Sequence, residues 1–305
     1  MQVNLKIFDI VAPFDFDLTA KVFSRGDGQI QTYSGGEYSR VLRIGDKLLL
    51  ASIRSMGTFD QPKLLVNLRS DGEISRGDKI AAKKLISTIF DLKLDLKPFY
   101  RTVTADKVIS KLVGRLKGLK AIATPTAFEA LVCSILEQQI SLNVAFNIER
   151  KLIKKFGDAL TIDEGIYYAF PTPERLSLAT MKQFRACGLS RRKAEYVKGV
   201  SKLLTSGELK LEDMKDMDEK TVFSELCKMR GIGRWTAELT MVRGMHKHDT
   251  MPADDLGLRR CIARYYRGGK PVSSDEARAV AEKWKPWRGY ASFYLIVASR
   301  LGIRA

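Results

Sequence analysis

Hydrophobic and polar positions mix through the first hundred residues in a way that is typical of an antiparallel sheet. Short runs rich in aliphatic residues are separated by the turn sequences GDG, SGG and GD. These runs predict strands at 3–8, 40–45, 47–53 and 63–69. One helix is expected to follow at 77–92, where the apolar positions that share a face are Ile80, Leu85, Ile86, Ile89 and Phe90.

From about residue 104 the apolar positions take the spacing of amphipathic helices. The helix at 124–139 opens with Thr126 and Glu129 at the spacing of a capping box, and Ser141 caps a helix that ends at Gly157. Further helices are predicted at 180–187, 190–205, 218–228, 234–245, 256–266, 274–284 and 288–301. The predicted fold class is α+β overall: an N-terminal antiparallel β-sheet domain with a helix over 1–103, followed by a mainly α-helical domain over 104–305. We expect two helical lobes in this second domain, with a cleft between them.

Cysteine and histidine usage supports neither a zinc finger nor a four-cysteine iron–sulfur site. The four cysteines are scattered without a CxxC pair, and the chain has two histidines. No run approaches the ~20 apolar residues of a membrane span, and the N-terminus carries acids where a signal peptide is basic and then apolar. We therefore expect no required cofactor and no membrane partner. The expected location is the cytoplasm, with the nucleoid if the source is prokaryotic.

Charge is unevenly distributed along the chain. The formal net charge is +17; the first hundred residues hold 15 Lys/Arg and 12 Asp/Glu, and the rest hold 37 and 23. An excess of this size in one part of a chain attracts a polyanion, and nucleic acid is the commonest one. A basic surface can also serve solubility alone, so charge by itself assigns no reaction.

The segment KMRGIGRWTAELTMVRG, residues 228–244, has the form of a helix, a tight Gly-Ile-Gly turn and a second helix. The two glycines allow a sharp turn and leave room for a ligand, while the amides at 233–236 open the next helix and point outward toward a phosphate. This is the spacing of a helix-hairpin-helix, which grips DNA through its backbone without reading sequence. The residues expected to bind DNA here are Arg230, Gly231, Gly233, Arg234 and Thr236.

Three segments together resemble one enzyme family: AFEALVCSILEQQIS (127–141), LCKMRGIGRWTAE with PADDLGLRR, and WKPWRGYASFYL (284–295). The chain resembles the helix-hairpin-helix, Gly/Pro-rich-loop, aspartate (HhH-GPD) superfamily of DNA glycosylases, and within it the 3-methyladenine DNA glycosylase II (AlkA-type) branch. The opening PFDFDLT extends the resemblance over nearly the whole chain. It implies base excision repair: a monomer that flips damaged bases out of double-stranded DNA and hydrolytically removes alkylated purines of the 3-methyladenine and 7-methylguanine type.

The resemblance also implies catalytic roles. Family members that cut the DNA backbone carry a lysine two positions after the second hairpin glycine, where this chain has Trp235, so a glycosylase without lyase activity is implied. The family's catalytic aspartate corresponds to Asp255, with Asp254 as the rival. An aspartate here can also simply cap the helix that starts at Leu256.

The remaining implied roles concern the pocket, the DNA wedge and a cation. The pocket residues are Trp235, Tyr290, Trp287, Leu239, Ile296 and Phe14, with Phe16 as a second candidate from the first domain. Leu239 stands where a tyrosine is typical and Ile296 where a tryptophan is typical, which implies a smaller or differently shaped pocket. The wedge that fills the gap after base flipping is Gln139, or else Ile140. A structural Na⁺ or K⁺ is expected on the main-chain carbonyls of Cys227, Met229 and Ile232, although Arg230 replaces the proline usual before the first hairpin glycine.

Two other functions fit part of the pattern. A non-catalytic helix-hairpin-helix module would explain the charge and the hairpin but not PADDLGLRR. A glycosylase for oxidised or deaminated bases would share the fold, but members of that kind often carry the lysine or a cysteine cluster that this chain lacks.

Overall fold

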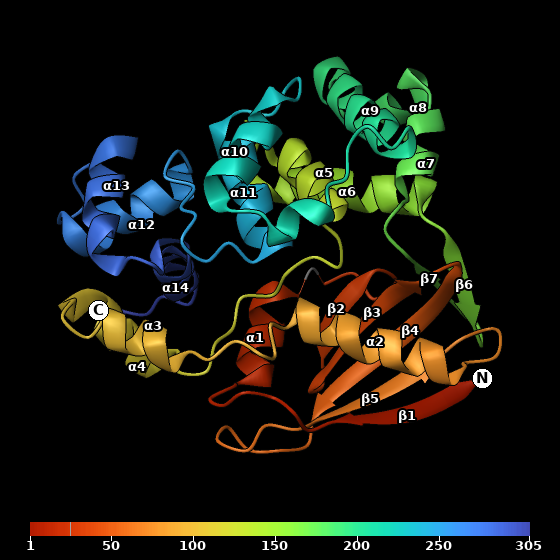
Figure 1. Cartoon of the computed structure of the whole chain (residues 1–305), viewed down its shortest axis with the longest axis horizontal. Helices are drawn as coiled ribbons and strands as arrows, with labels where there is room; N and C mark the ends of the chain where they lie inside the picture. The colour runs from red at the N-terminus through yellow and green to blue at the C-terminus, as the bar shows by residue number, and fades with distance from the viewer. Residues whose placement is uncertain (25) are drawn as a thin grey trace.

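The structure is a computed structural model that describes residues 1–24 and 26–305, and it confirms the predicted fold class. A five-stranded antiparallel sheet lies beside a mainly helical body (Figure 1). The strand order is β1-β5-β4-β3-β2, with each neighbouring pair antiparallel. The strands are β1 (Gln2–Ile7), β2 (Gln31–Ser34), β3 (Glu37–Ile44), β4 (Lys47–Ser55) and β5 (Leu64–Arg69).

Helices α1 (Phe16–Phe23) and α2 (Arg76–Ile89) contribute to the core on one face of this sheet. In α2 the buried stripe runs through Ala82, Ile86 and Ile89, whereas Ile80 is 61% exposed. The prediction that Ile80 shares the apolar face is wrong, because a residue two positions before Ala82 points about 200° away around a helix. Helix α1 is not among the predicted elements; Asp15 caps it by accepting a hydrogen bond from the Leu18 amide.

The other face of the sheet is covered by a hairpin that the sequence did not predict. Strands β6 (Ala159–Ile162) and β7 (Gly165–Tyr168) reach from the helical body to the sheet (Figure 1). Leu160 and Ile162 pack there with Val41 and Leu50. The central strand β4 is therefore buried on both faces, which explains its unbroken aliphatic run.

The helical body contains every helix predicted for it, with ends that differ by a few residues, and three more. The predicted helices are α5 (Ala127–Glu137), α6 (Leu142–Phe156), α8 (Met181–Ala186), α9 (Arg191–Thr205), α10 (Glu219–Lys228), α11 (Arg234–Met245), α12 (Leu256–Tyr266), α13 (Ser274–Ala281) and α14 (Arg288–Arg300). The additional ones are α3 (Lys97–Thr102), α4 (Lys107–Arg115) and α7 (Pro173–Leu178). Short 3₁₀ turns lie at Asp213–Asp216 and Glu282–Trp284.

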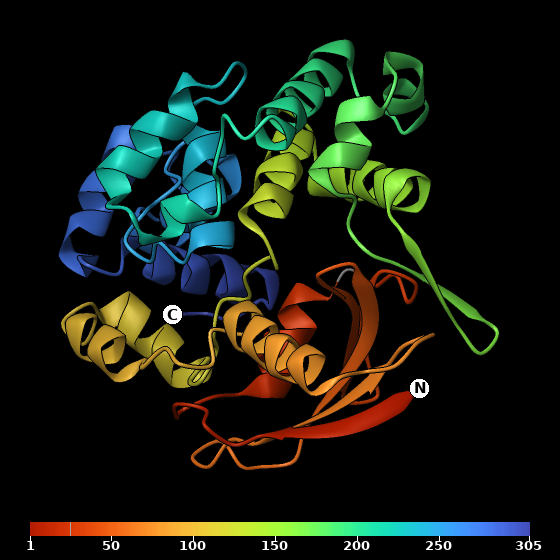
Figure 2. The ribbon, with the colours of Figure 1, turned by 45° about the vertical axis from the view of Figure 1, so that its right-hand side comes forward.

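Two hydrophobic cores organise this body, and Figure 2 shows the helices that form them from a second side. The first gathers side chains from α5 to α11, and the second gathers α3, α4, α12, α13 and α14 around the fully buried Trp284. The chain passes from the first core to the second through residues 246–255, immediately before α12. In the described part of the chain no helix is long and apolar enough to cross a membrane.

Helix caps follow the predictions with one exception. Ser141 and Gly157 bound α6 as expected, and Thr126 caps α5 by accepting a hydrogen bond from the Glu129 amide. The Glu129 side chain does not complete the predicted capping box. It forms a buried ion pair with Arg40 of β3 instead, with oxygen–nitrogen distances of 2.7 and 2.9 Å, and so ties the sheet to the helical body.

Candidate active site

The Gly-Ile-Gly turn joins α10 to α11, and its two glycines differ in backbone conformation and in the space around them. Gly231 has φ +87°, and a Cβ there would lie 2.4 Å from the Tyr196 ring of α9. Nothing lies within 4 Å of the corresponding position at Gly233. The expectation that both glycines leave room for a ligand is therefore wrong for Gly231, where Tyr196 fills the space, while Gly233 is open and exposed.

The first amides of any helix have no partner within the helix, and at α11 no side-chain cap satisfies them. An uncapped helix N-terminus of this kind attracts an anion such as a phosphate. The Arg234 side chain, 55% exposed, stands at the same end.

A glutamine that the sequence reasoning did not single out holds the hairpin against α5. The side-chain amide of Gln138 donates to the Gly231 carbonyl and to the Thr236 hydroxyl, both at 2.9 Å. Thr236 is only 2% exposed, so the DNA contact predicted at this residue rests on its backbone amide and not on its hydroxyl. The sequence signal for this role is the EQQ segment, in which the wedge was predicted at Gln139 and no role was predicted for Gln138.

Arg230, expected to bind DNA, projects from the turn with a side chain that is 80% exposed. It pairs with Glu195 of α9 at 3.1 Å. Ion pairs this exposed contribute little to stability, so the guanidinium can exchange its partner for a phosphate at small cost.

Asp255 and Trp235 meet at the start of α12. Asp255 caps this helix, because its Oδ1 accepts a hydrogen bond from the Leu258 amide at 2.7 Å. Its Oδ2 accepts a second hydrogen bond, from the Trp235 indole at 3.1 Å. The capping role and a placement suited to catalysis therefore coincide: the half-buried carboxylate is fixed from both sides.

The rival acid is held differently. The Asp254 carboxylate is 38% exposed and lies 3.8 Å from Arg278 of α13. Among the described residues, the Trp235 indole donates its hydrogen bond to Asp255 and not to Asp254. The geometry therefore favours Asp255 over its neighbour.

The expected pocket residues do not all gather at this carboxylate. Leu239 lies on α11, one turn after Trp235, and is 7% exposed, and Ile296 is half-buried on α14. Phe14 and Tyr290 are each 2% exposed. Phe14 and Phe16 belong to the core of the sheet domain, and Tyr290 belongs to the second helical core. Neither Phe14 nor Tyr290 is therefore open to a flipped base.

Trp287 lies with Tyr290 rather than with Trp235. Its ring is stacked on His248 at 5.8 Å and also contacts Phe99 and Tyr290. The sequence resemblance named these aromatic residues as one group and could not separate residues that line a pocket from residues that fill a core.

The segment between α5 and α6 presents the two predicted wedge residues to solvent. Gln139 adopts φ +55°, in the left-handed region that non-glycine residues rarely occupy, and it is exposed. Ile140 is 36% exposed, and Leu142 and Val144 continue an exposed apolar strip at the start of α6. Strained backbone of this kind clusters at functional sites, which fits a loop that projects into DNA.

A buried acid on α11 was missed by the sequence reasoning. Glu238 is 6% exposed and lies 3.1 Å from Arg278 and 3.6 Å from Arg234. Burial raises the pKa of Glu238 to about 7; Arg278 and Arg234 oppose this shift, and Asp254 adds to it. This carboxyl therefore changes its charge near neutral pH directly beside the hairpin.

Glu238→Gln should remove a pH dependence of stability. The folded protein holds the Glu238 proton more tightly than the unfolded chain, where the pKa is near 4.5. The stabilisation of the folded state by this bound proton is therefore fully present below pH 4.5 and is lost as the pH rises through about 7. Relative to the variant, the wild-type free energy of unfolding should fall by up to about 3 kcal/mol across this range. Urea unfolding at several pH values measures it; an equal difference at every pH would contradict the assignment.

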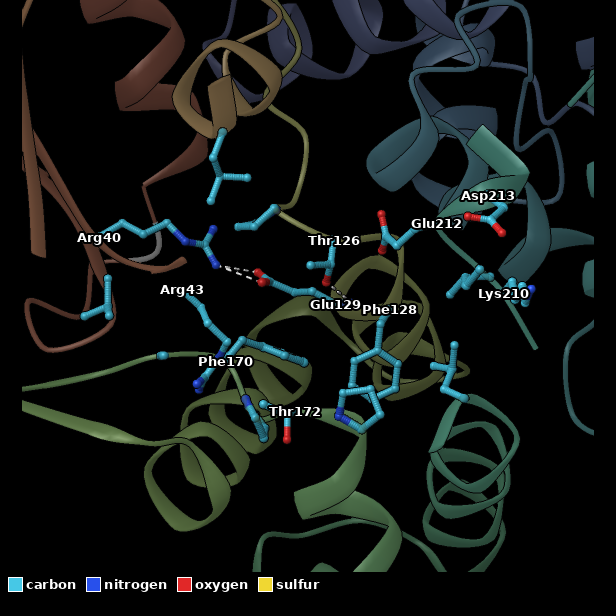
Figure 3. A pocket seen from close by; sticks show the side chains of 18 residues that line it. Arg40, Arg43, Thr126, Phe128, Glu129, Phe170, Thr172, Lys210, Glu212 and Asp213 are labelled. Atoms are coloured by element: carbon cyan, nitrogen blue, oxygen red, sulfur yellow. Dashed lines mark hydrogen bonds and ion pairs between the residues drawn. The ribbon is translucent and has the colours of Figure 1, made fainter. Parts of the chain in front are cut away.

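A separate cavity of about 570 Å³ lies where the sheet, the start of α5 and the β7–α7 connection meet (Figure 3). The paired Arg40 and Glu129 form one wall, and Phe128 and Phe170 line it together with Thr126. Its described lining includes none of the predicted site residues.

Known proteins that resemble this chain identify its family. Residues 132–286 match the family model described as HhH-GPD superfamily base excision DNA repair protein. The chain is 31% identical over 258 residues to a DNA-3-methyladenine glycosylase of Bacillus subtilis, covering 84% of each chain, and 26% identical to DNA-3-methyladenine glycosylase 2 of Escherichia coli, covering 93% of each. The structure of a 3-methyladenine DNA-glycosylase from Archaeoglobus fulgidus superimposes with a TM-score of 0.85 at 27% identity, covering 97% of this chain and 98% of that one. The chain belongs to the HhH-GPD superfamily of base excision DNA repair proteins.

Proposed function

We propose that this protein is a DNA glycosylase that hydrolytically removes alkylated purines, of the 3-methyladenine and 7-methylguanine type, from double-stranded DNA. The observation that carries the proposal is the Asp255 carboxylate, held between the Trp235 indole and the N-terminus of α12 within twenty-five residues of the Gly-Ile-Gly turn. The named relatives support the substrate class.

The chemistry needs an anion beside the sugar. Breaking an N-glycosidic bond builds positive charge on the deoxyribose, and a fixed carboxylate stabilises this charge without reorganising during the reaction. Asp255 supplies the anion and can orient the attacking water. Alkylation at N3 or N7 makes the purine cationic and weakens the bond, so the base can leave without a general acid.

Trp235 supports hydrolysis without strand cleavage. Cleavage through a Schiff base needs an amine at the sugar, and an indole nitrogen is not a nucleophile of this kind. In the structure the indole N–H is used to position Asp255. We therefore propose that the product is an abasic site in an intact strand.

Trp235→Phe should slow base release by on the order of ten- to a hundredfold, because the ring remains while the donor that fixes Asp255 is lost. Single-turnover base release with enzyme in excess measures the effect on the chemical step. Trp284→Phe is the matched control: its buried indole donates to Asp106 at 2.7 Å, so it should lower thermal stability but leave the single-turnover rate of folded protein unchanged. Equal rates for wild type and Trp235→Phe would remove the positioning role.

We propose that the DNA backbone is gripped at Gly233 and the first amides of α11, with Arg230 and Arg234 adding charge. Gln139 is the proposed wedge, with Ile140 beside it, because the left-handed turn at Gln139 exposes both.

We also propose that a monovalent cation is held by the main-chain carbonyls of the turn, at Cys227, Met229 and Ile232. The Met229 carbonyl accepts the Ile232 amide at 3.1 Å, which leaves its second lone pair for such an ion. The protein is proposed to act as a monomer on chromosomal DNA in the cytoplasm.

A substrate panel tests this function against its rivals. Duplexes that each carry one lesion, 3-methyladenine, 7-methylguanine, hypoxanthine or 8-oxoguanine, are incubated with the protein, and the free base is measured. We expect release of the two methylated purines at rates well above those of 8-oxoguanine. Preferred release of 8-oxoguanine would assign the protein to oxidised bases, and tight binding without any release would make it a DNA-binding module.

A further inference from the structure

The chain has two histidines, and both face one carboxylate. His246 Nδ1 lies 3.4 Å from Asp91 Oδ2, and His248 Nε2 lies 3.3 Å from the same oxygen. One ligand atom from each of the three residues lies within 4.8 Å of the other two. Asp91 comes from the segment between α2 and α3, whereas the histidines begin the connection from α11 to α12. The cluster therefore joins the sheet domain to the loop that leads to Asp255.

The shared oxygen of Asp91 is buried, and the two histidine nitrogens face it at distances longer than those of a good hydrogen bond to a carboxylate. A buried carboxylate oxygen is costly unless it is well satisfied, and an ion placed between the three side chains would satisfy it. The spacing identifies the kind of ligand: two donors at about 2.0–2.1 Å from a tetrahedral zinc ion lie about 3.3–3.4 Å apart. Both measured nitrogen–oxygen distances have this value.

The surroundings hold the cluster in shape. The His248 ring is stacked on Trp287, with an interplanar angle of 23°, and meets Tyr290 edge-on at 81°. The nearby Lys120 ammonium donates to the main-chain carbonyls of Val11, Asp91, Leu92 and Leu94 rather than to the carboxylate.

The backbone at two of the three residues also adopts an uncommon conformation. Asp91 has φ +47° and His246 has φ +54°, so two of the three residues occupy the left-handed region. Few non-glycine residues adopt it, and those that do are held by their surroundings. These values support the site but do not define its ligand.

We propose that Asp91, His246 and His248 bind a divalent transition-metal ion, Zn²⁺, with water in the fourth position. Two imidazole nitrogens with one carboxylate oxygen form a donor set that suits zinc and disfavours Mg²⁺ and Ca²⁺, which take oxygen ligands. The ion does not take part in base removal. It fastens the α11–α12 connection, and with it Asp255, to the sheet domain.

The two histidines allow a direct test on the full-length protein. The chain is labelled with ¹⁵N at histidine, freed of metal with a chelator, and titrated with Zn²⁺ alone while both imidazoles are followed by NMR. We expect both side chains to shift together and to saturate at one equivalent, with a rise in the thermal midpoint. Failure of both to shift would overturn the proposal and leave Asp91 as an ion-pair partner of the histidines.

Variants separate this site from the four cysteines, which can also bind zinc. Asp91→Asn keeps the side-chain shape, and His246→Asn suits the left-handed backbone; each should weaken Zn²⁺ affinity by at least about a hundredfold. Asp95→Asn is the control, because Asp95 lies four residues away, accepts a hydrogen bond from the Lys97 amide and is not one of the three proposed ligands. Affinity that is unchanged in both site variants would place the zinc elsewhere and overturn the proposal. If a variant fails to fold, the wild-type NMR titration still decides.

Discussion

Asp255→Asn should lower the rate of base release from an alkylated duplex by about a thousandfold. Asparagine caps a helix as well as aspartate does, so the hydrogen bond from the Leu258 amide can persist and the fold should be retained. The charge is lost, however, and with it the stabilisation of the cationic sugar in the transition state. Single-turnover kinetics and a thermal melt on the same preparation separate the two effects.

Asp254→Asn is the matched control, because it removes the same charge one residue earlier. Asp254 lies 3.8 Å from Arg278 and has no hydrogen bond from Trp235 in the described structure. Its removal should change base release by less than about tenfold. The assignment of Asp255 would be refuted if Asp254→Asn abolished release and Asp255→Asn did not.

Gly231→Ala is expected to have the largest effect on the hairpin. The added methyl group would meet the Tyr196 ring at 2.4 Å, and φ +87° is strained for alanine. Together these should cost about 2–4 kcal/mol and weaken binding to any duplex, damaged or not. Chemical unfolding and fluorescence anisotropy with a labelled duplex measure the two losses.

Gly233→Ala, two residues later, serves as the comparison. Its φ of −91° suits alanine and its Cβ would meet nothing within 4 Å, so the fold should be unaffected apart from a few tenths of a kcal/mol at the cap. If a phosphate approaches this position, DNA affinity should fall while stability holds. Unchanged affinity in Gly233→Ala would move the phosphate contact away from α11.

The helices were predictable because their signals are local. Caps such as Ser141 and Gly157 and the period of the apolar positions depend on a few neighbouring residues. The β6–β7 hairpin was not predictable, because its strands are four residues each and are fixed by packing on the sheet rather than by their own pattern. Glu129 shows the same limit: its position suggests a capping box, but Arg40, 89 residues away, takes the side chain.

The candidate site shows the same difference between local sequence signals and packing between distant residues. The order of Gly231, Trp235 and Asp255 along the chain pointed to the hairpin and the acid, and the structure brings the last two together. Exposure could not be inferred, since an aromatic residue suits a core and a stacking pocket equally; Phe14 and Tyr290 prove to be core residues.

The most direct test of the central claim follows both products of one reaction. The protein is incubated with a duplex that contains 3-methyladenine, and the free base, the strand length and any covalent complex trapped by borohydride are measured together. We predict that free 3-methyladenine accumulates, that nothing is trapped, and that the strand breaks only after alkali is added. Absence of the free base despite binding would contradict a glycosylase, and a trapped complex with a broken strand would contradict hydrolysis through Asp255.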